Sequence, residues 1–254
     1  MLPKKLIQLK ELSEWAILIG YRGSIAHGLY VPQENPNSID DKDIMSIIIP
    51  SKEYYLGLKE FGSKGTKEIK QDEWDIVIYE VKKFINLLSK GNPNVLSMLW
   101  LPEDCYIYLS EEGKELIKNR NLFVSKQVYH SFVGYAYGQL HRMTHQAFQG
   151  YMGEKRKKLV KEFGYDTKNA SHLIRLLRMG IEFLVEGKLY VRRKDSHELL
   201  SIKRGEWSLE KVKETATDLF KKAELAYINS FLPNEIDIDK INSLCIKILE
   251  RRLK

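Results

Sequence analysis

The sequence contains few cysteines and no long apolar run, and each of these absences excludes a class of protein. The two cysteines, Cys105 and Cys245, are too few and too far apart for a disulfide framework or a cysteine-based zinc site. No stretch approaches the length that crosses a membrane, and the residues after Met1 show no signal-peptide core. We therefore expect a cytoplasmic protein with no membrane partner.

What the chain does have is length, ordinary apolar content and positive charge. Its 254 residues, of which 43% are hydrophobic, are enough for one large domain or two modest ones. The formal net charge of +7 favours polyanionic partners such as RNA or DNA. Much of the charge lies in short clusters at 155–158 and 192–194, which solvated surface explains equally well. Basicity alone therefore does not decide the partner.

Three short apolar segments in the first half of the chain are typical of buried strands. Residues 15–21 end at glycine-rich sequence, residues 44–50 end at a proline, and residues 74–79 alternate between two faces. A polar loop is expected over 57–71. Residues 81–90 have helical spacing and stop at a Gly-Asn-Pro sequence.

Beyond about residue 123 the pattern becomes that of long amphipathic helices. Such helices are expected over 125–149, 167–186, 209–229 and 239–252. We therefore predict an α+β fold with two domains. A small mixed β-sheet core with helices occupies residues 1–124, and a mainly helical C-terminal domain occupies residues 125–254.

Two polar elements lie at the ends of the predicted strands. Gly23 permits close backbone approach, and the Ser24 hydroxyl and neighbouring amides can bind phosphate at a helix start. Asp41 and Asp43 are two residues apart, so an extended chain projects both from one face. Asp75 lies on another predicted strand, and it joins the pair only if those strands are neighbours. Arg22, directly before the glycine, either reaches a phosphate or pairs with a carboxylate.

Three crowded carboxylates repel one another unless a cation lies between them. Two magnesium ions roughly 4 Å apart can activate an attacking oxygen and stabilise a leaving pyrophosphate. We therefore predict that Asp41, Asp43 and Asp75 are catalytic residues that bind Mg²⁺, in a two-ion site that Mn²⁺ can also fill. A lone Gly-Ser or Asp-x-Asp is more often structural, but their order along the chain favours catalysis.

This order resembles the polymerase-β-like nucleotidyltransferase superfamily, whose pattern is hG[GS]…Dh[DE]h followed by a third carboxylate on a later strand. More narrowly, the chain is similar to the predicted nucleotidyltransferases of the YcgL type, also called the RNA-ligase-associated family. Residues 39–43, Ile-Asp-Asp-Lys-Asp, depart from the usual Ser-Asp-x-Asp, and the segment before them is lengthened. The matching segments are 20–29, 41–50, 74–100, 168–189 and 201–210.

The resemblance implies transfer of a nucleoside monophosphate from an NTP such as ATP to a hydroxyl acceptor, with release of pyrophosphate. It implies that Gly23 and Ser24 contact the nucleotide phosphates and that the three aspartates bind metal. Asp75 would also help to activate the acceptor hydroxyl. The alternative to an enzyme is a module that binds a nucleotide or RNA without turnover. All three aspartates are present, and this favours the enzyme.

A basic stripe follows on the helix that begins near residue 168. Lys168, His172 and Arg175 lie on the side opposite the apolar stripe. The stripe is either solvent-exposed or closes over the active site to hold the triphosphate or an acceptor phosphate. Its recurrence in the resembled family favours substrate binding.

The acceptor is the least determined part of the hypothesis. The net charge and the resemblance favour an RNA end, tRNA included, over a small molecule or a protein side chain. Most aromatic residues have spacings typical of a core rather than of a base-stacking platform. The sequence leaves open the selected base, the number of nucleotides added, the oligomeric state, and the roles of His27 and Asn92.

Overall fold

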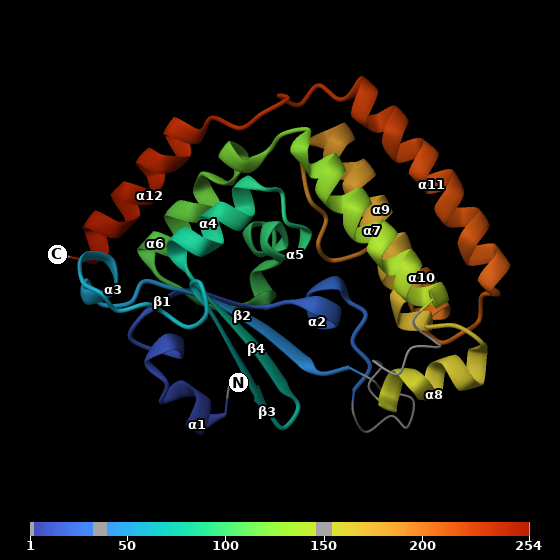
Figure 1. The fold of residues 1–254 in the computed structure, drawn as a ribbon, viewed down its shortest axis with the longest axis horizontal. Helices are drawn as coiled ribbons and strands as arrows, with labels where there is room; N and C mark the ends of the chain where they lie inside the picture. The colour runs from blue at the N-terminus through green and yellow to red at the C-terminus, as the bar shows by residue number, and fades with distance from the viewer. Residues whose placement is uncertain (1–2, 33–39, 146–153, 254) are drawn as a thin grey trace. The chain divides into compact units, whose positions relative to one another are not determined.

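A computed structural model of the protein describes residues 3–32, 40–145 and 154–253 (Figure 1). Within these residues the chain forms a five-stranded mixed sheet and many helices, which dominate its second half. The predicted α+β fold with a helical C-terminal region is confirmed. In the described part of the chain, no helix is long and apolar enough to cross a membrane.

The strands of the sheet lie in the order β3-β4-β2-β1-β5. β2 and β4 are parallel, whereas the other neighbours are antiparallel. The bounds are Ala16–Tyr21 for β1, Lys42–Ile48 for β2, Thr66–Gln71 for β3, Trp74–Glu80 for β4 and Tyr106–Leu109 for β5. The three apolar segments of the sequence are thus β1, β2 and β4, and they occupy the centre of the sheet together.

The predicted polar loop over 57–71 is wrong at its end, where β3 pairs with β4 across a tight turn. Ile69 is the only large apolar residue in this strand, so its sequence lacks the apolar run of a buried strand. β3 is an edge strand, and an edge strand in an antiparallel pair can expose one face to water. Asp72 in the turn has φ +53, a value that aspartate tolerates better than most residues.

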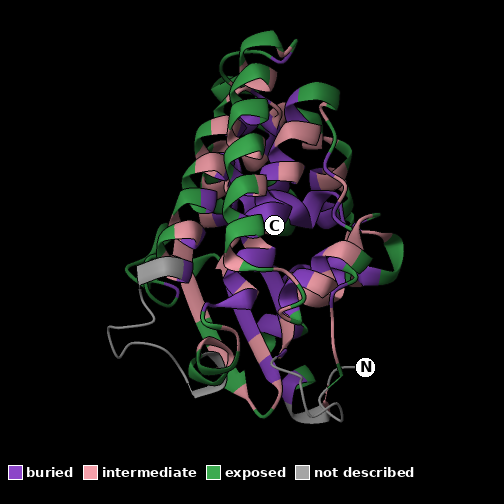
Figure 2. Cartoon of the chain, turned by 90° about the vertical axis from the view of Figure 1, so that its right-hand side faces the viewer, coloured by how far each residue is buried: buried purple, intermediate pink, exposed green. Residues whose placement is uncertain are grey.

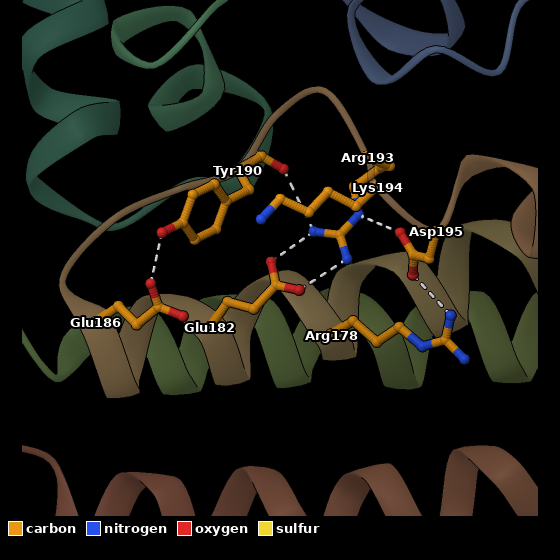
Figure 3. Close-up of a pocket in the computed structure, with 7 residues that line it drawn as sticks. All are labelled: Arg178, Glu182, Glu186, Tyr190, Arg193, Lys194 and Asp195. Carbon is orange, nitrogen blue, oxygen red and sulfur yellow. Dashed lines mark hydrogen bonds and ion pairs between the residues drawn. The ribbon is translucent and has the colours of Figure 1, made fainter.

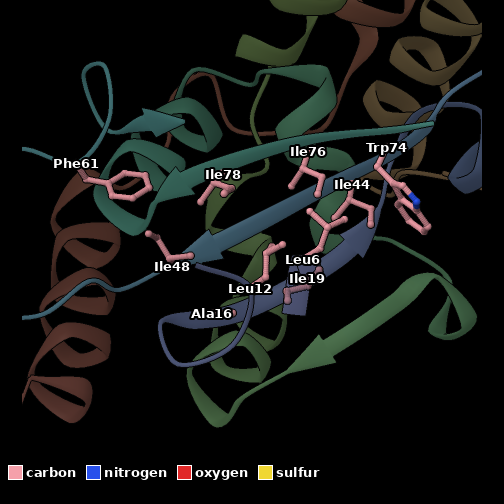
Figure 4. Close-up of a cluster of buried hydrophobic side chains, with 10 residues drawn as sticks. All are labelled: Leu6, Leu12, Ala16, Ile19, Ile44, Ile48, Phe61, Trp74, Ile76 and Ile78. Carbon is pink, nitrogen blue, oxygen red and sulfur yellow. The ribbon is translucent and has the colours of Figure 1, made fainter. Parts of the chain in front are cut away.

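One face of the sheet carries a cluster of buried apolar side chains (Figure 4). β2 and β4 contribute residues from one face, β1 contributes Ala16 and Ile19 across a register shift, and the N-terminal segment adds Leu6 and Leu12. Burial of each large side chain stabilises the fold by roughly 1.5–3 kcal/mol. The cluster consists of Leu6, Leu12, Ala16, Ile19, Ile44, Ile48, Phe61, Trp74, Ile76 and Ile78.

Short helices and 3₁₀ turns complete this part of the molecule. Helix α4 is capped by Glu80, whose carboxylate accepts hydrogen bonds from two backbone amides, and Asn92 caps α5 in the same way. The helices are α1 (Lys4–Ile7), α2 (Gly23–His27), α3 (Glu53–Leu56), α4 (Val81–Ser89), α5 (Pro93–Leu96), α6 (Glu111–Lys118) and α12 (Ile238–Arg252). The 3₁₀ turns are η1 (Lys10–Leu12), η2 (Ser97–Leu99), η3 (Glu103–Cys105) and η4 (Arg120–Phe123).

The second half contains the long helices that the sequence predicts. They are α7 (Gln127–His145), α8 (Glu154–Phe163), α9 (Thr167–Glu186), α10 (Ser196–Lys203) and α11 (Leu209–Asn229). Residues 146–149 of the first expected helix lie outside the described residues. Helix α9 is central, because α7, α10 and α11 all pack against it. Helix α11 buries only Val212, Ala216 and Ala223, and its outer side is largely exposed (Figure 2).

The chain divides into two compact units that do not follow the predicted domains at every point. Of the described residues, the first unit contains those up to His27, from Asp40 to Val124 and from Ile236 onward, and the second unit contains the rest. The chain passes from the first unit to the second at the expected boundary after residue 124. Helix α12, however, packs on α4 and α6 of the first unit through Ile241, Leu244 and Ile248.

Candidate active site

The site is built on the parallel pair of strands β2 and β4. Asp43 and Asp75 lie directly opposite each other in the register of this pair. Because side chains alternate between the faces of a sheet, paired positions project from the same face. Their side chains are 27% and 23% exposed. The two predicted strands are therefore neighbours, and they bring these two carboxylates together.

The Gly-Ser turn follows the adjacent strand β1 and touches this carboxylate pair. The backbone amide of Arg22 donates to the carbonyl of Asp43 at 2.9 Å, and the chain then turns at Gly23, whose φ is +61. A Cβ atom at Gly23 would lie 2.3 Å from Oδ2 of Asp43. Only glycine allows both this conformation and this approach.

The hydroxyl of Ser24 is an unsatisfied donor next to the pair. Its oxygen is enclosed, and it has no hydrogen-bond partner among the residues that the structure describes. A buried polar group without a partner costs about 1–3 kcal/mol. A phosphate oxygen would accept a hydrogen bond from this hydroxyl. The orphaned donor therefore fits a phosphate-bearing ligand.

The carboxylate pair has cationic neighbours. One terminal nitrogen of Arg22 lies 3.6 Å from Oδ1 of Asp43 and 3.4 Å from Oδ1 of Asp75. Nζ of Lys70 lies 3.8 Å from Oδ2 of Asp75. These charges offset the repulsion between the carboxylates. Of the two roles that the sequence left open for Arg22, the structure shows pairing with carboxylates, and with both of them.

The third predicted metal ligand is placed differently. Asp41 lies just before β2 and is half-buried. In residues 3–32, 40–145 and 154–253, no group of three His, Cys, Asp or Glu side chains is arranged to hold a metal ion. The structure thus shows Asp43 beside Asp75, and the place of Asp41 in a metal site stays a prediction. Magnesium is often bound by one or two carboxylates together with substrate phosphates and water, so this pair still fits the ion.

The comparison with known families decides the identity of this arrangement. Residues 8–246 match RlaP, the RNA repair pathway DNA polymerase beta family. The chain belongs to this family. It is therefore a polymerase-β-like nucleotidyltransferase by descent, as the sequence pattern predicted.

Other comparisons add little to the family assignment. A nucleotidyltransferase-like protein from Exiguobacterium sibiricum 255-15 is similar in structure, with 12% sequence identity and a TM-score of 0.30. The match covers 98% of this chain and 72% of that chain. A similarity at this level carries no argument about the site. None of the curated proteins matches.

The prediction of a basic stripe on α9 that faces away from the core is wrong for one of its three residues, Arg175. Lys168 and His172 are half-buried, but Arg175 is buried, with 6% of its surface exposed. Its Nη1 lies 3.2 Å from Sδ of Met179, and its Nε has no partner among the described residues. Burial, together with nearby Arg193, lowers the pKa of Arg175 to about 9.

The reason is the central position of α9. A helical projection identifies one apolar stripe, but three helices cover α9 and leave little of it facing water. Arg175 therefore does not face away from the core. The substrate-binding role of Lys168, His172 and Arg175 stays a prediction.

A network of charged side chains near Arg175 lines a pocket of about 500 Å³ (Figure 3). Arg193 donates to both carboxylate oxygens of Glu182, at 2.6 and 2.8 Å, and to Asp195 at 2.8 Å. Arg178 donates to Asp195 at 2.7 Å and to Glu198 at 2.6 Å. Burial alone would raise the pKa of Asp195, but the hydrogen bonds from Arg193 and Arg178 lower it below its usual value.

This network could not be predicted, because residues 192–194 have the composition of a solvated basic cluster. Arg193 is instead buried, with 4% of its side chain exposed. All three nitrogen atoms of its guanidinium donate hydrogen bonds to protein oxygens. This is the pattern of a structural ion pair.

Proposed function

We propose that the protein is a magnesium-dependent nucleotidyltransferase that moves a nucleoside monophosphate from an NTP to a hydroxyl at an RNA end. Membership of a polymerase-β family supports nucleotidyl transfer as the reaction class. The observation that carries the proposal is the in-register placement of Asp43 and Asp75 beside Gly23 and Ser24. We place this activity in the cytoplasm, with pyrophosphate as the second product.

Each residue of the site has a distinct part in this proposal. Ser24 donates its hydroxyl hydrogen to a phosphate oxygen, and Gly23 lets that phosphate approach the backbone. Asp75 orients the acceptor hydroxyl and takes part in the removal of its proton. Magnesium, or manganese in its place, would be held by Asp43 and Asp75, with Asp41 nearby, and would neutralise the triphosphate.

Arg22 is compatible with a cation at the same carboxylates. Its contacts of 3.4 and 3.6 Å are longer than those of a tight charge-assisted hydrogen bond, and its side chain is 23% exposed. Partly exposed ion pairs of this kind are weak, typically about 1 kcal/mol or less. A divalent cation that arrives with the nucleotide therefore meets little competition from Arg22.

RNA is supported as the acceptor by two independent observations. The family description places relatives in RNA repair, and the chain carries a formal net charge of +7. A polyanionic acceptor gains affinity from such a charge through counterion release.

The test is nucleotidyl transfer by the purified full-length protein. It is incubated with Mg²⁺, each of the four α-labelled NTPs in turn and RNA with a free 3′ hydroxyl, and labelled RNA is separated by electrophoresis. We expect labelled RNA with the wild type and with the surface control Glu60→Gln, and none with Asp43→Asn or Asp75→Asn. Labelled RNA that persists in both aspartate variants, or its absence with every NTP, would contradict the proposal.

A further inference from the structure

A groove of about 810 Å³ lies between α7 and α11 in the second unit. Aromatic rings, lysines and small or aliphatic residues make up most of its lining, together with His141, Thr217 and Glu224. Those that carry the argument are Tyr129, Tyr137, Lys213, Phe220 and Lys221. We propose that this groove binds single-stranded RNA, with bases against the aromatic rings and phosphates against the lysines. The inference rests on the proposed function in one respect, since it assigns this strand as the acceptor.

The aromatic residues form two stacks that bridge the helices. The rings of Tyr137 and Phe220 are stacked with centroids 4.3 Å apart, and those of Tyr129 and Tyr227 with centroids 4.5 Å apart. The ring of His130 lies edge-on to Tyr227 at 5.6 Å. At 1.5 Å per residue, the two stacks are about 12 Å apart along α7. A strand of several nucleotides can span that distance.

Tyr137 is the most exposed of these rings, and Tyr129, Phe220 and Tyr227 are half-buried. Tyr137 is 56% exposed, although a tyrosine on a helix that packs against its neighbours commonly buries most of its ring. One turn before it on α7, Gly134 is exposed, and a Cβ built there would meet nothing within 4 Å. A glycine in a helix interior is less favourable than alanine, and no packing contact requires it here. The space over this part of α7 is open.

The charges around the groove favour an anion. Lys213 and Lys221 are both exposed and lie two turns apart on the face of α11 that carries Phe220. Nζ of Lys126 lies 5.8 Å from the ring centroid of Tyr227, at the other stack. Glu224 is the one acidic residue that lines the groove.

Aromatic faces interleaved with cations are what a single strand requires. Bases stack on the faces of the rings, and cations pair with the phosphates along the backbone. A purely apolar peptide would leave the lysines without partners, and a basic peptide would be repelled. The sequence indicated core spacings for most aromatic residues, and this set would be the exception. These rings come from two helices far apart in the chain, so no local spacing identifies them.

The test measures RNA affinity separately from catalysis. A short fluorescein-labelled oligouridylate is titrated with full-length protein, without nucleotide or metal, and its anisotropy is followed at several salt concentrations. We expect Tyr137→Ala and Phe220→Ala each to weaken binding about tenfold, and Tyr137→Trp to retain it. Tyr108→Ala, at an exposed tyrosine of the first unit, is the matched control and should bind as the wild type does.

The lysines are tested through the salt dependence. The double variant of Lys213→Ala and Lys221→Ala should reduce the slope of log affinity against log salt by about 1.4, the value for two single-strand phosphate contacts. A double variant of Lys118→Ala and Lys188→Ala, both at exposed positions, should leave the slope unchanged.

Several outcomes would overturn the inference. They are wild-type affinity in folded Tyr137→Ala and Phe220→Ala variants, no measurable binding by the wild type, or self-association through the groove that Tyr137→Ala abolishes while RNA affinity stays unchanged. The Asp43→Asn variant separates the two proposals, because it should bind RNA normally while losing transfer. Groove-dependent RNA binding without any transfer would leave this inference standing and refute the proposed reaction.

Discussion

The molecule contains two clusters of aspartate and arginine that differ in how completely the charges are paired. In the first unit, Arg22 lies 3.4–3.6 Å from Asp43 and Asp75, and all three side chains are about a quarter exposed. In the second unit, Arg193 donates to Glu182 and Asp195 at 2.6–2.8 Å and is 4% exposed. The same residue types thus form one loose cluster with long ion pairs and one tight cluster with short hydrogen bonds around a buried arginine.

The difference indicates what each cluster does. In the tight cluster the buried guanidinium of Arg193 is held by short hydrogen bonds to protein carboxylates, so loss of this pairing is costly. In the loose cluster the contacts with Arg22 are long and the carboxylates are about a quarter exposed, so a cation or a substrate hydroxyl can replace Arg22 there. The loose cluster should therefore govern activity, and the tight cluster should govern stability.

The largest expected effect comes from the loose cluster. Asp43→Asn removes one negative charge from the metal-binding pair while preserving its shape, so we expect nucleotidyl transfer to fall about a thousandfold or more. Thermal unfolding should shift little, because the carboxylate is weakly paired. Removal of divalent cations with EDTA should abolish transfer, and added Mg²⁺ should restore it. Full nucleotidyl transfer by Asp43→Asn would contradict the conclusion that the loose cluster governs activity.

The tight cluster should show the opposite pattern. Arg193→Met leaves Glu182 and Asp195 without their principal donor, and we expect the free energy of unfolding to decrease by about 3 kcal/mol. Urea unfolding of the variant and the wild type at neutral pH measures this change. Arg204→Met, at an exposed arginine in the same unit, is the control and should change stability by less than about 0.5 kcal/mol. Equal stability of the Arg193 variant and the wild type would contradict a structural role.

Gly23→Ala tests the geometry that keeps the loose cluster open. The added Cβ would meet Oδ2 of Asp43 at 2.3 Å, and the positive φ would be strained. We expect the free energy of unfolding to decrease by about 1–3 kcal/mol. Nucleotidyl transfer should also fall, because the added Cβ displaces the carboxylate of Asp43. Differential scanning calorimetry and the transfer assay measure the two effects. Gly164→Ala is a useful reference, since it carries a similar φ of +79 but has open space around it.

The smallest expected effect is a pH dependence in the tight cluster. The pKa of Asp195 is lowered in the folded state, so its stabilising contribution is present above the unfolded value of 3.8 and is lost as the pH falls below it. Asp195→Asn should therefore be less stable than the wild type by about 1 kcal/mol at pH 7. The gap should narrow at pH 3 and below, as urea unfolding at both pH values would show. A stability difference between Asp195→Asn and the wild type that grows at low pH would contradict a lowered pKa of Asp195 in the folded state.

Much of the sheet could be predicted because its central strands are encoded locally. β1 and β2 contain apolar runs followed closely by glycine or proline, β4 contains the buried segment Ile76–Ile78, and burial on both faces requires such residues. β3 could not be predicted in this way. Its sequence is polar because it lies at an edge, and its pairing with β4 depends on the turn between them.

The site was partly predictable for the same reason. The spacing of Gly23, Asp43 and Asp75 along the chain indicated their chemistry, but their convergence depends on β2 lying between β1 and β4. The burial of Arg175 was missed because a helical projection shows one packed side and cannot reveal that further helices cover the others.

The assignment of α12 to the first unit has a consequence for how the protein is made. This helix is translated after the second unit, yet Ile241, Leu244 and Ile248 are buried in the first unit, and Lys247 pairs with Glu115 at 2.7 Å. Until its residues leave the ribosome, the surfaces of α4 and α6 that α12 covers remain open to water and to chaperones. The first unit therefore completes its folding only after the residues of the second unit have been translated.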